Sequence, residues 1–288
     1  MIKIYDRQNK KYITEEQYGQ KYLSILYNTL YGRILSKIIL NPITSEFIGL
    51  YKKSKLSRKD INKIIKDYNI DMTLYEPKEY KSFNDFFTRK IILKNRKLIE
   101  NDNYFISPSD SKLLVYKITN DNILNIKGST YTLNELVKNK IDISKYNNGL
   151  CLIFRLSMDN YHHYCYPDNG KILRNFKIKG KLHTVSSISK KHKVYKENKR
   201  EVSILKTENF DELIYIEVGA LLVGEIINNK DIKFKKGEEK GYFRLGGSTI
   251  IILVKENILK IDDDILNNSK KGIETIVKYR EKIGEKLW

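Results

Sequence analysis

Near the C-terminus, a glycine-rich turn is followed directly by a Ser-Thr pair and an apolar run. The segment is Leu245-Gly-Gly-Ser-Thr-Ile-Ile-Ile-Leu253. A serine hydroxyl can act as a nucleophile when a base activates it, and a preceding glycine helps because it adopts backbone conformations that other residues avoid. Gly-Gly-Ser is also common in ordinary hairpin turns. The segment alone therefore leaves a reactive serine and a plain turn both open.

A reactive serine needs a base, and the chain has only four histidines. His192 lies in Lys-Lys-His-Lys, where positive charge and solvent make it a poor base. His162 and His163 are adjacent, so their side chains point apart if the segment is extended. His183 lies in the strand-like stretch 180–185. Asp110 follows Ser-Pro-Ser, where an ordinary turn residue is common.

Four segments, in order, resemble motifs of the phosphatidylserine decarboxylase family, of its shorter bacterial kind. In that family the motifs are an aromatic-rich helix, Ser-Pro-Ala-Asp-Gly, Arg-Leu-x-Pro-x-Asp-Tyr-His and a Gly-Ser-Thr cleavage site. Here Ser109 and Ser111 replace the Ala and Gly of the second motif. The matching segments, within about Phe83 to Val254, are Phe86-Phe-Thr-Arg89, Ser107-Pro-Ser-Asp110, Arg155-Leu-Ser-Met-Asp-Asn-Tyr-His162 and Leu245-Gly-Gly-Ser-Thr249.

The resemblance implies a proenzyme that cuts itself between Gly247 and Ser248, into a β chain of residues 1–247 and an α chain of residues 248–288. Attack of the Ser248 hydroxyl on the Gly247 carbonyl turns the peptide into an ester. Elimination then leaves a dehydroalanine, which hydrolyses to ammonia and a pyruvoyl group. This pyruvoyl group is the expected covalent cofactor, and it withdraws electrons much as pyridoxal phosphate does. The expected reaction is decarboxylation of phosphatidylserine to phosphatidylethanolamine.

By the same resemblance, Asp110 orients the base that activates Ser248, and His162 protonates the substrate carbon after carbon dioxide leaves. The common family pattern Tyr-His-Arg-x-His supplies a second histidine as the cleavage base, but this chain has Tyr161-His-His-Tyr-Cys165. We therefore expect His183 to be the base, at a position where better-known members carry an aromatic residue. The alternatives are that His162 serves both steps and that His183 is an ordinary core or surface residue.

Two further residues have expected roles. Cys165 is expected to be a small packing residue rather than a nucleophile. Arg200, with Asn198 and Glu201, lies in a stretch that resembles the family's Asn-Glu-Arg region, and it is a candidate to bind the lipid phosphate. A solvated charge cluster is the alternative. Because the two cysteines are too few and too oddly spaced for a zinc site or a disulfide framework, no metal is expected.

Helical patterns dominate the first third of the chain. Apolar residues recur at helical spacing from Lys21 to Leu40, and this helix is expected either to pack on the core or to lie on a bilayer. Ser57 and Asp60 predict a capping box at the start of a second helix. A third, short helix is expected to carry Phe83, Phe86 and Phe87.

After about Tyr104, short β-rich runs separated by Gly, Asn and Asp turns predict a body that is mainly β. Helical spacing returns from Ser269 to Leu287. We therefore expect an α+β fold with a helical N-terminal third, a mainly β catalytic core and a C-terminal helix. The expected parts are a helical, membrane-associating region of residues 1–100 and a β-rich core of residues 101–288. The predicted β runs include 113–118, 150–156, 214–218 and 249–254.

The formal net charge is +19, which favours anionic partners. The expected partners are phosphatidylserine, an anionic membrane surface and the two cleaved chains, and a homodimer stays open. No stretch reaches the roughly 20 apolar residues of a membrane span. Since two cysteines also indicate a reducing compartment, we expect peripheral attachment to the cytoplasmic face of the cell membrane.

Two other functions compete with this interpretation. A basic nucleic-acid-binding module would account for the charge and for interleaved Lys and Tyr, but it leaves the ordered motifs unexplained, so no nucleic acid is expected. A pyruvoyl-dependent decarboxylase acting on another serine-headed lipid or on a soluble amino acid is the closer alternative. The sequence does not determine headgroup or acyl-chain specificity.

Overall fold

The structure is a computed structural model that describes residues 2–15, 42–119, 121, 123–126, 129–180, 198–219, 225–245 and 248–287. Several predictions fall outside these residues. They are the helix at 21–40, the proposed base His183, the neighbouring His192 and the Gly247 side of the cleavage site.

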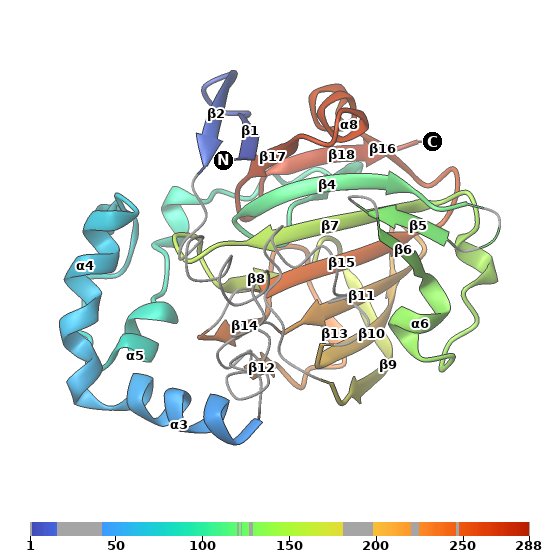
Figure 1. The fold of residues 1–288 in the computed structure, drawn as a ribbon. Coiled ribbons are helices and arrows are strands. Elements are labelled where there is room, and N and C mark those ends of the chain that lie inside the picture. Colours follow the sequence, from blue (N-terminus) through green and yellow to red (C-terminus); the bar gives the residue numbers. More distant parts are fainter. Residues whose placement is uncertain are drawn as a thin grey trace.

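A ten-stranded sheet forms the centre of the molecule (Figure 1). All neighbouring strands are antiparallel except β1 and β17, which are parallel. Strands from both ends of the chain therefore meet in one sheet. In sheet order the strands are β13 (Lys233–Phe234), β9 (Gly170–Ile178), β10 (Arg200–Thr207), β11 (Glu212–Val218), β15 (Ser248–Val254), β7 (Leu150–Leu156), β4 (Ser111–Lys117), β17 (Glu274–Val277), β1 (Ile2–Asp6) and β2 (Lys11–Glu15).

Strand β15 lies inside this sheet, between β11 and β7, and every one of its residues is buried. A continuous run of branched apolar residues suits a strand that is covered on both faces. Ile250 and Ile252 belong to one buried cluster, and Ile251 and Leu253 belong to another. Strand β15 is thus held by two neighbouring strands and by two layers of core, and Ser248, its first residue, pairs with Leu156 of β7.

Smaller sheets complete the β body. Tyr164 of β8 and Phe243 of β14 share a buried cluster with Ile250 and Ile252, so the sheet of β8 and β14 covers one face of the central sheet. Residues 245–247 connect β14 directly to β15. The three small sheets are β12 (Glu225–Asn228), β14 (Glu239–Arg244) and β8 (His163–Cys165); β16 (Leu259–Ile261), β18 (Lys282–Lys286) and β3 (Tyr104–Ile106); and β5 (Ile123–Ile126) with β6 (Ser129–Thr132).

Helices α3 (Pro42–Lys53), α4 (Lys59–Asp67) and α5 (Phe83–Phe87) lie together at one side of the β body (Figure 1). The predicted helices at α4 and α5 are confirmed, and the aromatic side chains of α5 are buried. The predicted capping box is wrong, because α4 has no side-chain cap. Instead the Ser57 hydroxyl contacts the Lys52 and Ser54 carbonyls and accepts a hydrogen bond from the Phe83 N–H.

The remaining helical segments are short. The α-helices are α6 (Leu133–Val137) and α8 (Asp263–Lys270), and the 3₁₀ turns are Lys55–Arg58, Met72–Leu74, Leu93–Asn95 and Ser144–Tyr146.

Both ends of the chain differ from the sequence-based prediction. Residues 2–15, placed in a helical third, form β1 and β2, because Ile2 and Ile4 alternate with polar residues as in a strand. The C-terminal helix predicted at 269–287 is wrong. Helix α8 ends at Lys270, Gly272 adopts a positive φ of 68°, and β17 and β18 follow. The fold is α+β and mostly β.

Candidate active site

Ser248 is the candidate nucleophile, and its side chain is completely buried, with 0% exposure. Because side chains alternate along a strand, Ser248 lies on the same face of β15 as Ile250, toward β8 and β14. Among the described residues, its hydroxyl oxygen has no hydrogen-bond partner. A buried hydroxyl without a partner is costly, so it is unusual unless the site uses it.

His162 immediately precedes β8 and is also completely buried. Its ring packs against that of Phe87 of α5, with a centroid distance of 3.8 Å and a tilt of 36° between the ring planes. Its Nδ1 atom lies 3.0 Å from the Asn160 carbonyl oxygen. Since a carbonyl can only accept, Nδ1 carries the proton, and Nε2 keeps a lone pair that has no partner in the described part of the chain.

Burial is the main reason that the pKa of His162 lies well below its ordinary value of 6.5, and the nearby charge of Arg89 lowers it further. His162 is therefore neutral near pH 7. It can accept a proton at Nε2, and it must take one up before it can donate one.

The backbone holds His162 close to the strand that begins with Ser248. Ser248 pairs with Leu156, the last residue of β7, and the loop of residues 157–161 leads from there to His162. On the other side, the Phe243 N–H of β14 donates to the His162 carbonyl at 3.0 Å. His162 thus lies between the partner strand of Ser248 and the strand that precedes Ser248 in sequence.

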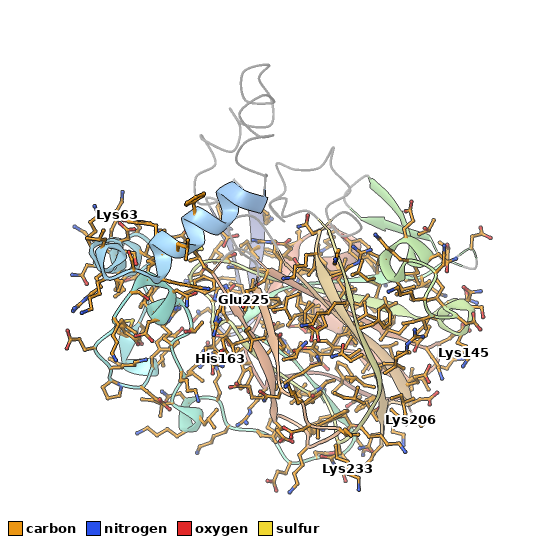
Figure 2. The ribbon with its side chains drawn as sticks, turned by 90° about the horizontal axis from the view of Figure 1, so that it is seen from below. Lys63, Lys145, His163, Lys206, Glu225 and Lys233 are labelled. Atoms are coloured by element: carbon orange, nitrogen blue, oxygen red, sulfur yellow. The ribbon has the colours of Figure 1, made fainter. Side chains whose placement is uncertain are left out.

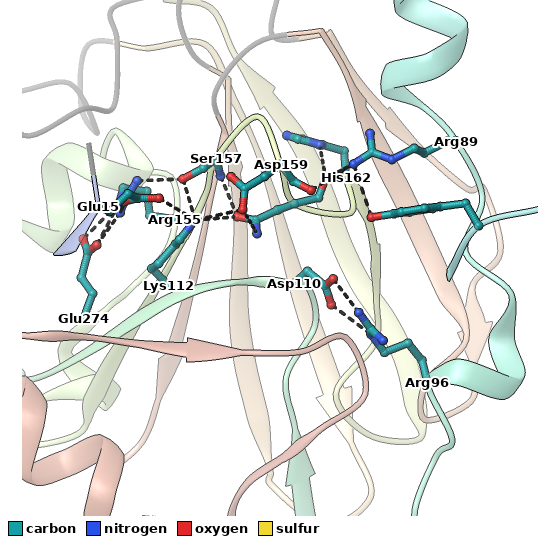
Figure 3. A network of polar contacts seen from close by, with 12 residues as sticks. Glu15, Arg89, Arg96, Asp110, Lys112, Arg155, Ser157, Asp159, His162 and Glu274 are labelled. Carbon is teal, nitrogen blue, oxygen red and sulfur yellow. Dashed lines mark hydrogen bonds and ion pairs between the residues drawn. The ribbon is translucent and has the colours of Figure 1, made fainter. Parts of the chain in front are cut away.

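Asp110 is buried immediately before β4. Its carboxylate accepts two hydrogen bonds from the Arg96 guanidinium, at 3.0 and 3.3 Å, and one from the Tyr279 N–H at 2.7 Å (Figure 3). These contacts fix the orientation of the carboxylate. No histidine within the described ranges contacts it.

Cys165 lies beside the same segment, since its N–H donates to the Pro108 carbonyl at 2.9 Å. The position at which the family motif has its second histidine is therefore next to the Asp110 turn. Burial raises the pKa of the Cys165 thiol to about 12, so the thiol stays protonated and is no base. Its place in the buried cluster around α5 is that of a packing residue.

A buried ion network lies next to the loop of residues 157–161 (Figure 3). Arg155 of β7 binds Glu274 of β17, with distances of 2.5 to 3.1 Å, and Glu15 of β2 at 3.0 Å. Lys112 of β4 binds Glu15 at 2.9 Å and the Ser157 hydroxyl at 3.0 Å. The network joins four strands of the central sheet to the start of this loop.

Arg200, the candidate phosphate ligand, is buried in β10 and donates to three backbone carbonyls. These belong to Leu136 at 2.6 Å, Asn198 at 2.8 Å and Glu135 at 2.9 Å. Burial lowers its pKa to about 10. In this arrangement Arg200 fastens β10 to α6.

Sequence reasoning missed Arg89, Arg96 and the buried ion pair between Lys240 and Glu217. Arg89 closes the Phe-Phe-Thr-Arg motif, which indicated only a helix. Arg96 stands in Lys-Asn-Arg-Lys, which has the composition of a solvated basic segment. No local signal distinguishes these side chains from exposed ones.

A family match spans the candidate site residues, from Asp110 to Ser248. A family model described as phosphatidylserine decarboxylase matches residues 83–285, from α5 to β18. The chain belongs to this family. Decarboxylases of this family are carboxy-lyases made as proenzymes, and the proenzyme form implies a pyruvoyl cofactor formed by self-cleavage.

Curated relatives match over nearly the whole chain. Phosphatidylserine decarboxylase proenzyme 2 of Clostridium acetobutylicum is 50% identical over 286 residues, which cover 99% of this chain and 98% of that protein. The phosphatidylserine decarboxylase proenzyme of Clostridium botulinum strain Langeland is 45% identical and covers 99% and 100%. That of Clostridium beijerinckii is 40% identical and covers all of both chains.

The residues present suit the pyruvoyl group of a phosphatidylserine decarboxylase. Ser248 would supply the carbon atoms, it follows a glycine, and no described residue forms a hydrogen bond with its buried hydroxyl. Among the described residues, no helix is long and apolar enough to span a bilayer.

Proposed function

We propose that this chain cuts itself between Gly247 and Ser248 and then decarboxylates phosphatidylserine with a pyruvoyl group made from Ser248. The observation that carries the proposal is the Ser248 hydroxyl, buried at the start of a central strand and without a partner among the described residues. This is the position that the family motif gives to the cleavage serine.

In the first reaction, Ser248 Oγ loses its proton and attacks the Gly247 carbonyl carbon. The new C–O bond replaces the peptide C–N bond, and the proton passes to the freed amine of Ser248. Elimination then removes the Cα proton of Ser248 and breaks its Cβ–Oγ bond, so that the oxygen leaves with the Gly247 carboxylate and a dehydroalanine remains. Water hydrolyses the dehydroalanine to the pyruvoyl group and ammonia. We propose His183 as the base and Asp110 as its orienting carboxylate. The neutral thiol of Cys165, at the position of the usual base, and the fixed Asp110 carboxylate support this assignment.

In the second reaction, the pyruvoyl group supplies a ketone that binds the substrate amine and withdraws electrons from the bond to the departing carboxylate. The substrate arrives with a charged ammonium group, and the neutral Nε2 atom of His162 can take its proton. Protonated His162 can then return a proton to the substrate carbon. His162 therefore acts first as base and then as acid, which extends the acid role expected from the sequence. Arg200 remains a prediction as a phosphate ligand.

We further propose that the helical part up to about residue 100 faces the cytoplasmic leaflet, while the core from residue 101 carries the chemistry. Apolar side chains on α3 and the following 3₁₀ turn support this, because Phe47, Leu50 and Leu56 are 68%, 60% and 74% exposed. Lysines lie beside them, at Lys53 and Lys55. Exposed apolar groups next to basic groups suit the interface of an anionic membrane.

Basic residues also lie elsewhere on the surface. In Figure 2, Lys145, Lys206 and Lys233 lie on the β body, away from Lys63 of α4. Charge by itself therefore does not select a face. The grouping of Phe47, Leu50 and Leu56 on α3 and the turn after it favours this face, although Leu173 and Ile232 are also exposed on the β body.

The proposed function is tested by the intact mass of the purified protein. We expect chains of 247 and 41 residues (288 − 247 = 41), the shorter one lighter by one ammonia than a peptide beginning with serine. Ser248→Ala should stay whole, whereas Ser203→Ala, a change at another buried serine, should still split. The split protein should release carbon dioxide from phosphatidylserine and not from free serine. A parent chain that is uncut and fully active would contradict the proposal.

A further inference from the structure

Two buried cations from distant segments meet at the loop of residues 157–161, which leads into His162 (Figure 3). Lys112 of β4 contacts the start of the loop at the Ser157 hydroxyl and also lies 3.4 Å from Asn160 Oδ1. Arg89, just after α5, reaches the end of the loop from the other side. The loop has few ways to move, because both of its ends are held by side chains of other segments.

Arg89 itself is held firmly. Its guanidinium lies over the rings of Tyr75 and Phe86, at 4.4 and 4.7 Å from their centroids. Its Nη2 atom donates to the backbone carbonyls of Asp159 at 3.0 Å and Asn160 at 3.2 Å. A planar guanidinium suits this arrangement, since it stacks on rings and donates in its plane.

The Asn160 carbonyl therefore has two donors, Arg89 Nη2 and His162 Nδ1. A carbonyl oxygen has two lone pairs and can accept both. Because Arg89 fixes this oxygen next to the imidazole, the proton is held on Nδ1 and the lone pair on Nε2. Phe87 packs against the ring and restricts its movement.

We propose that Arg89 is a positioning residue for His162. It keeps His162 in the neutral Nδ1–H tautomer, with Nε2 as the proton acceptor. It does so by holding the Asn160 carbonyl and by its own positive charge. The charged and titratable groups that act on His162 are Arg89, His163 and Lys112, and all three disfavour an added positive charge on the ring. The inference rests on the proposed role of His162 only for turnover, since tautomer and charge can be measured without turnover.

The test uses the uncut Ser248→Ala chain labelled with ¹⁵N-histidine, so no pyruvoyl group is present. Nitrogen chemical shifts report the protonation of each ring atom, and His162→Gln identifies the His162 signals. We expect one tautomer for His162, neutral at pH 6.5 and below. Arg89→Gln removes both charge and geometry, so the His162 pKa should rise toward its ordinary value and both tautomers should appear.

Arg89→Lys separates the two effects. A lysine keeps the charge but cannot donate to both carbonyls while stacked, so we expect the low His162 pKa to persist while the tautomers mix. In self-cleaved enzyme, Arg89→Gln should lower kcat/KM at acid pH by about tenfold. The value of kcat/KM should recover as pH rises. Arg58→Gln, at an arginine whose partner is the exposed Glu79, is the matched control and should leave the His162 signals unchanged.

If Arg89→Gln fails to fold, as judged by its melting curve, Arg89→Lys still decides the geometric part of the proposal. Unchanged His162 nitrogen shifts in Arg89→Lys would overturn the geometric part of the proposal. An unchanged His162 pKa in a folded Arg89→Gln chain would overturn the electrostatic part. If His162 shows the expected tautomer but His162→Gln loses no decarboxylase activity, the proposed role of His162 is contradicted. The Arg89 inference would then stay intact.

Discussion

At the residue scale, burial determines which proton transfers each side chain can make. The thiol of Cys165 keeps its proton, because its pKa is raised to about 12. The imidazole of His162 stays without a second proton, because burial and neighbouring positive charge lower its pKa. One residue is thus excluded as a base at neutral pH, and the other is prepared to be one.

The lowered pKa of His162 predicts how stability depends on pH. Below 6.5 the unfolded chain binds a proton at this histidine and the folded chain does not, so the free energy of unfolding falls as pH falls from 6.5 toward the folded pKa. The slope is at most about 1.4 kcal/mol per pH unit. Urea unfolding of Ser248→Ala at several pH values measures it, and adding His162→Gln should remove this component. Identical pH dependence with and without His162 would show that its pKa is not lowered.

The division of labour between two histidines predicts a simple gel result. His183→Ala should accumulate full-length chain, because loss of a general base costs roughly 10² to 10⁴ in rate. His162→Ala should still split but turn over phosphatidylserine poorly. Asp110→Asn should resemble His183→Ala. Normal cleavage of His183→Ala together with an uncut His162→Ala would make His162 the cleavage base.

The motifs single out Ser248, Asp110 and His162, because the order of short segments marks these positions whatever their surroundings, and their roles stay predictions. Motifs could not predict that Arg96 holds Asp110 or that Arg89 holds the loop before His162. A buried arginine and a solvated one look alike in sequence, and only the packing of distant segments separates them. The same reason explains Arg200, whose carbonyl partners come partly from α6.

At the element scale, the small sheet of β8 and β14 is joined to the central sheet by a buried ion pair. Lys240 of β14 binds Glu217 of β11, and both side chains are at most 1% exposed. Burial raises the pKa of Glu217 to about 7, although the charge of Lys240 opposes this rise. The pair helps to fix the layer beside His162 against the strand next to β15.

This pair predicts an asymmetric response to mutation. In uncut Ser248→Ala, Lys240→Met should lower the free energy of unfolding by about 3–5 kcal/mol, because it leaves a buried carboxylate unpaired. Combining it with Glu217→Leu should restore most of the loss. Arg244 lies on the same strand as Lys240 and forms a partly exposed ion pair with Glu225 of β12. Arg244→Met, which breaks this pair, should lower the free energy of unfolding by at most about 1 kcal/mol. Chemical denaturation measures all three. A double variant as unstable as Lys240→Met would mean that the charges themselves are needed.

The four named β runs, which became β4, β7, β11 and β15, were predictable because their apolar pattern is local, as in the continuous run of β15. The C-terminal segment was not, because Ile273, Ile276, Val277 and Ile283 fit a helical spacing as well as two short strands. Long-range pairing decided between them, since β17 is inserted between β4 and β1. The strands of residues 2–15 depend on the same distant partner.

At the scale of the whole molecule, the exposed apolar side chains of α3 and its following turn predict a membrane-facing side. Replacing Phe47, Leu50 and Leu56 together by serine should reduce pelleting with phosphatidylserine vesicles without affecting self-cleavage. Binding should also weaken with salt, because it is partly electrostatic. Matched substitution of Leu173 and Ile232, exposed on the β body, should leave binding unchanged. Equal loss in both variants, or salt-independent binding to neutral vesicles, would refute this assignment.

The two chains of the cleaved enzyme would be interleaved in one sheet. The α chain contributes β15, between β11 and β7, and β17, between β4 and β1. We expect the uncut Ser248→Ala chain to recover its spectrum after dilution from urea. Cleaved enzyme should stay together in native buffer but should not regain activity after the same treatment, because a separate 41-residue chain must insert two strands. Full recovery of activity would show that the cut leaves folding intact.

The position of β15 inside the central sheet therefore means that the cut changes whether an unfolded molecule can refold. Before the cut, an unfolded chain can refold as one chain. After the cut, the serine nitrogen has left as ammonia, and β15 must enter the sheet as part of a separate chain. Refolding then no longer restores the enzyme, and a molecule that has unfolded is replaced only by new synthesis. Under this scheme the working lifetime of the enzyme equals the time for which the central sheet stays folded.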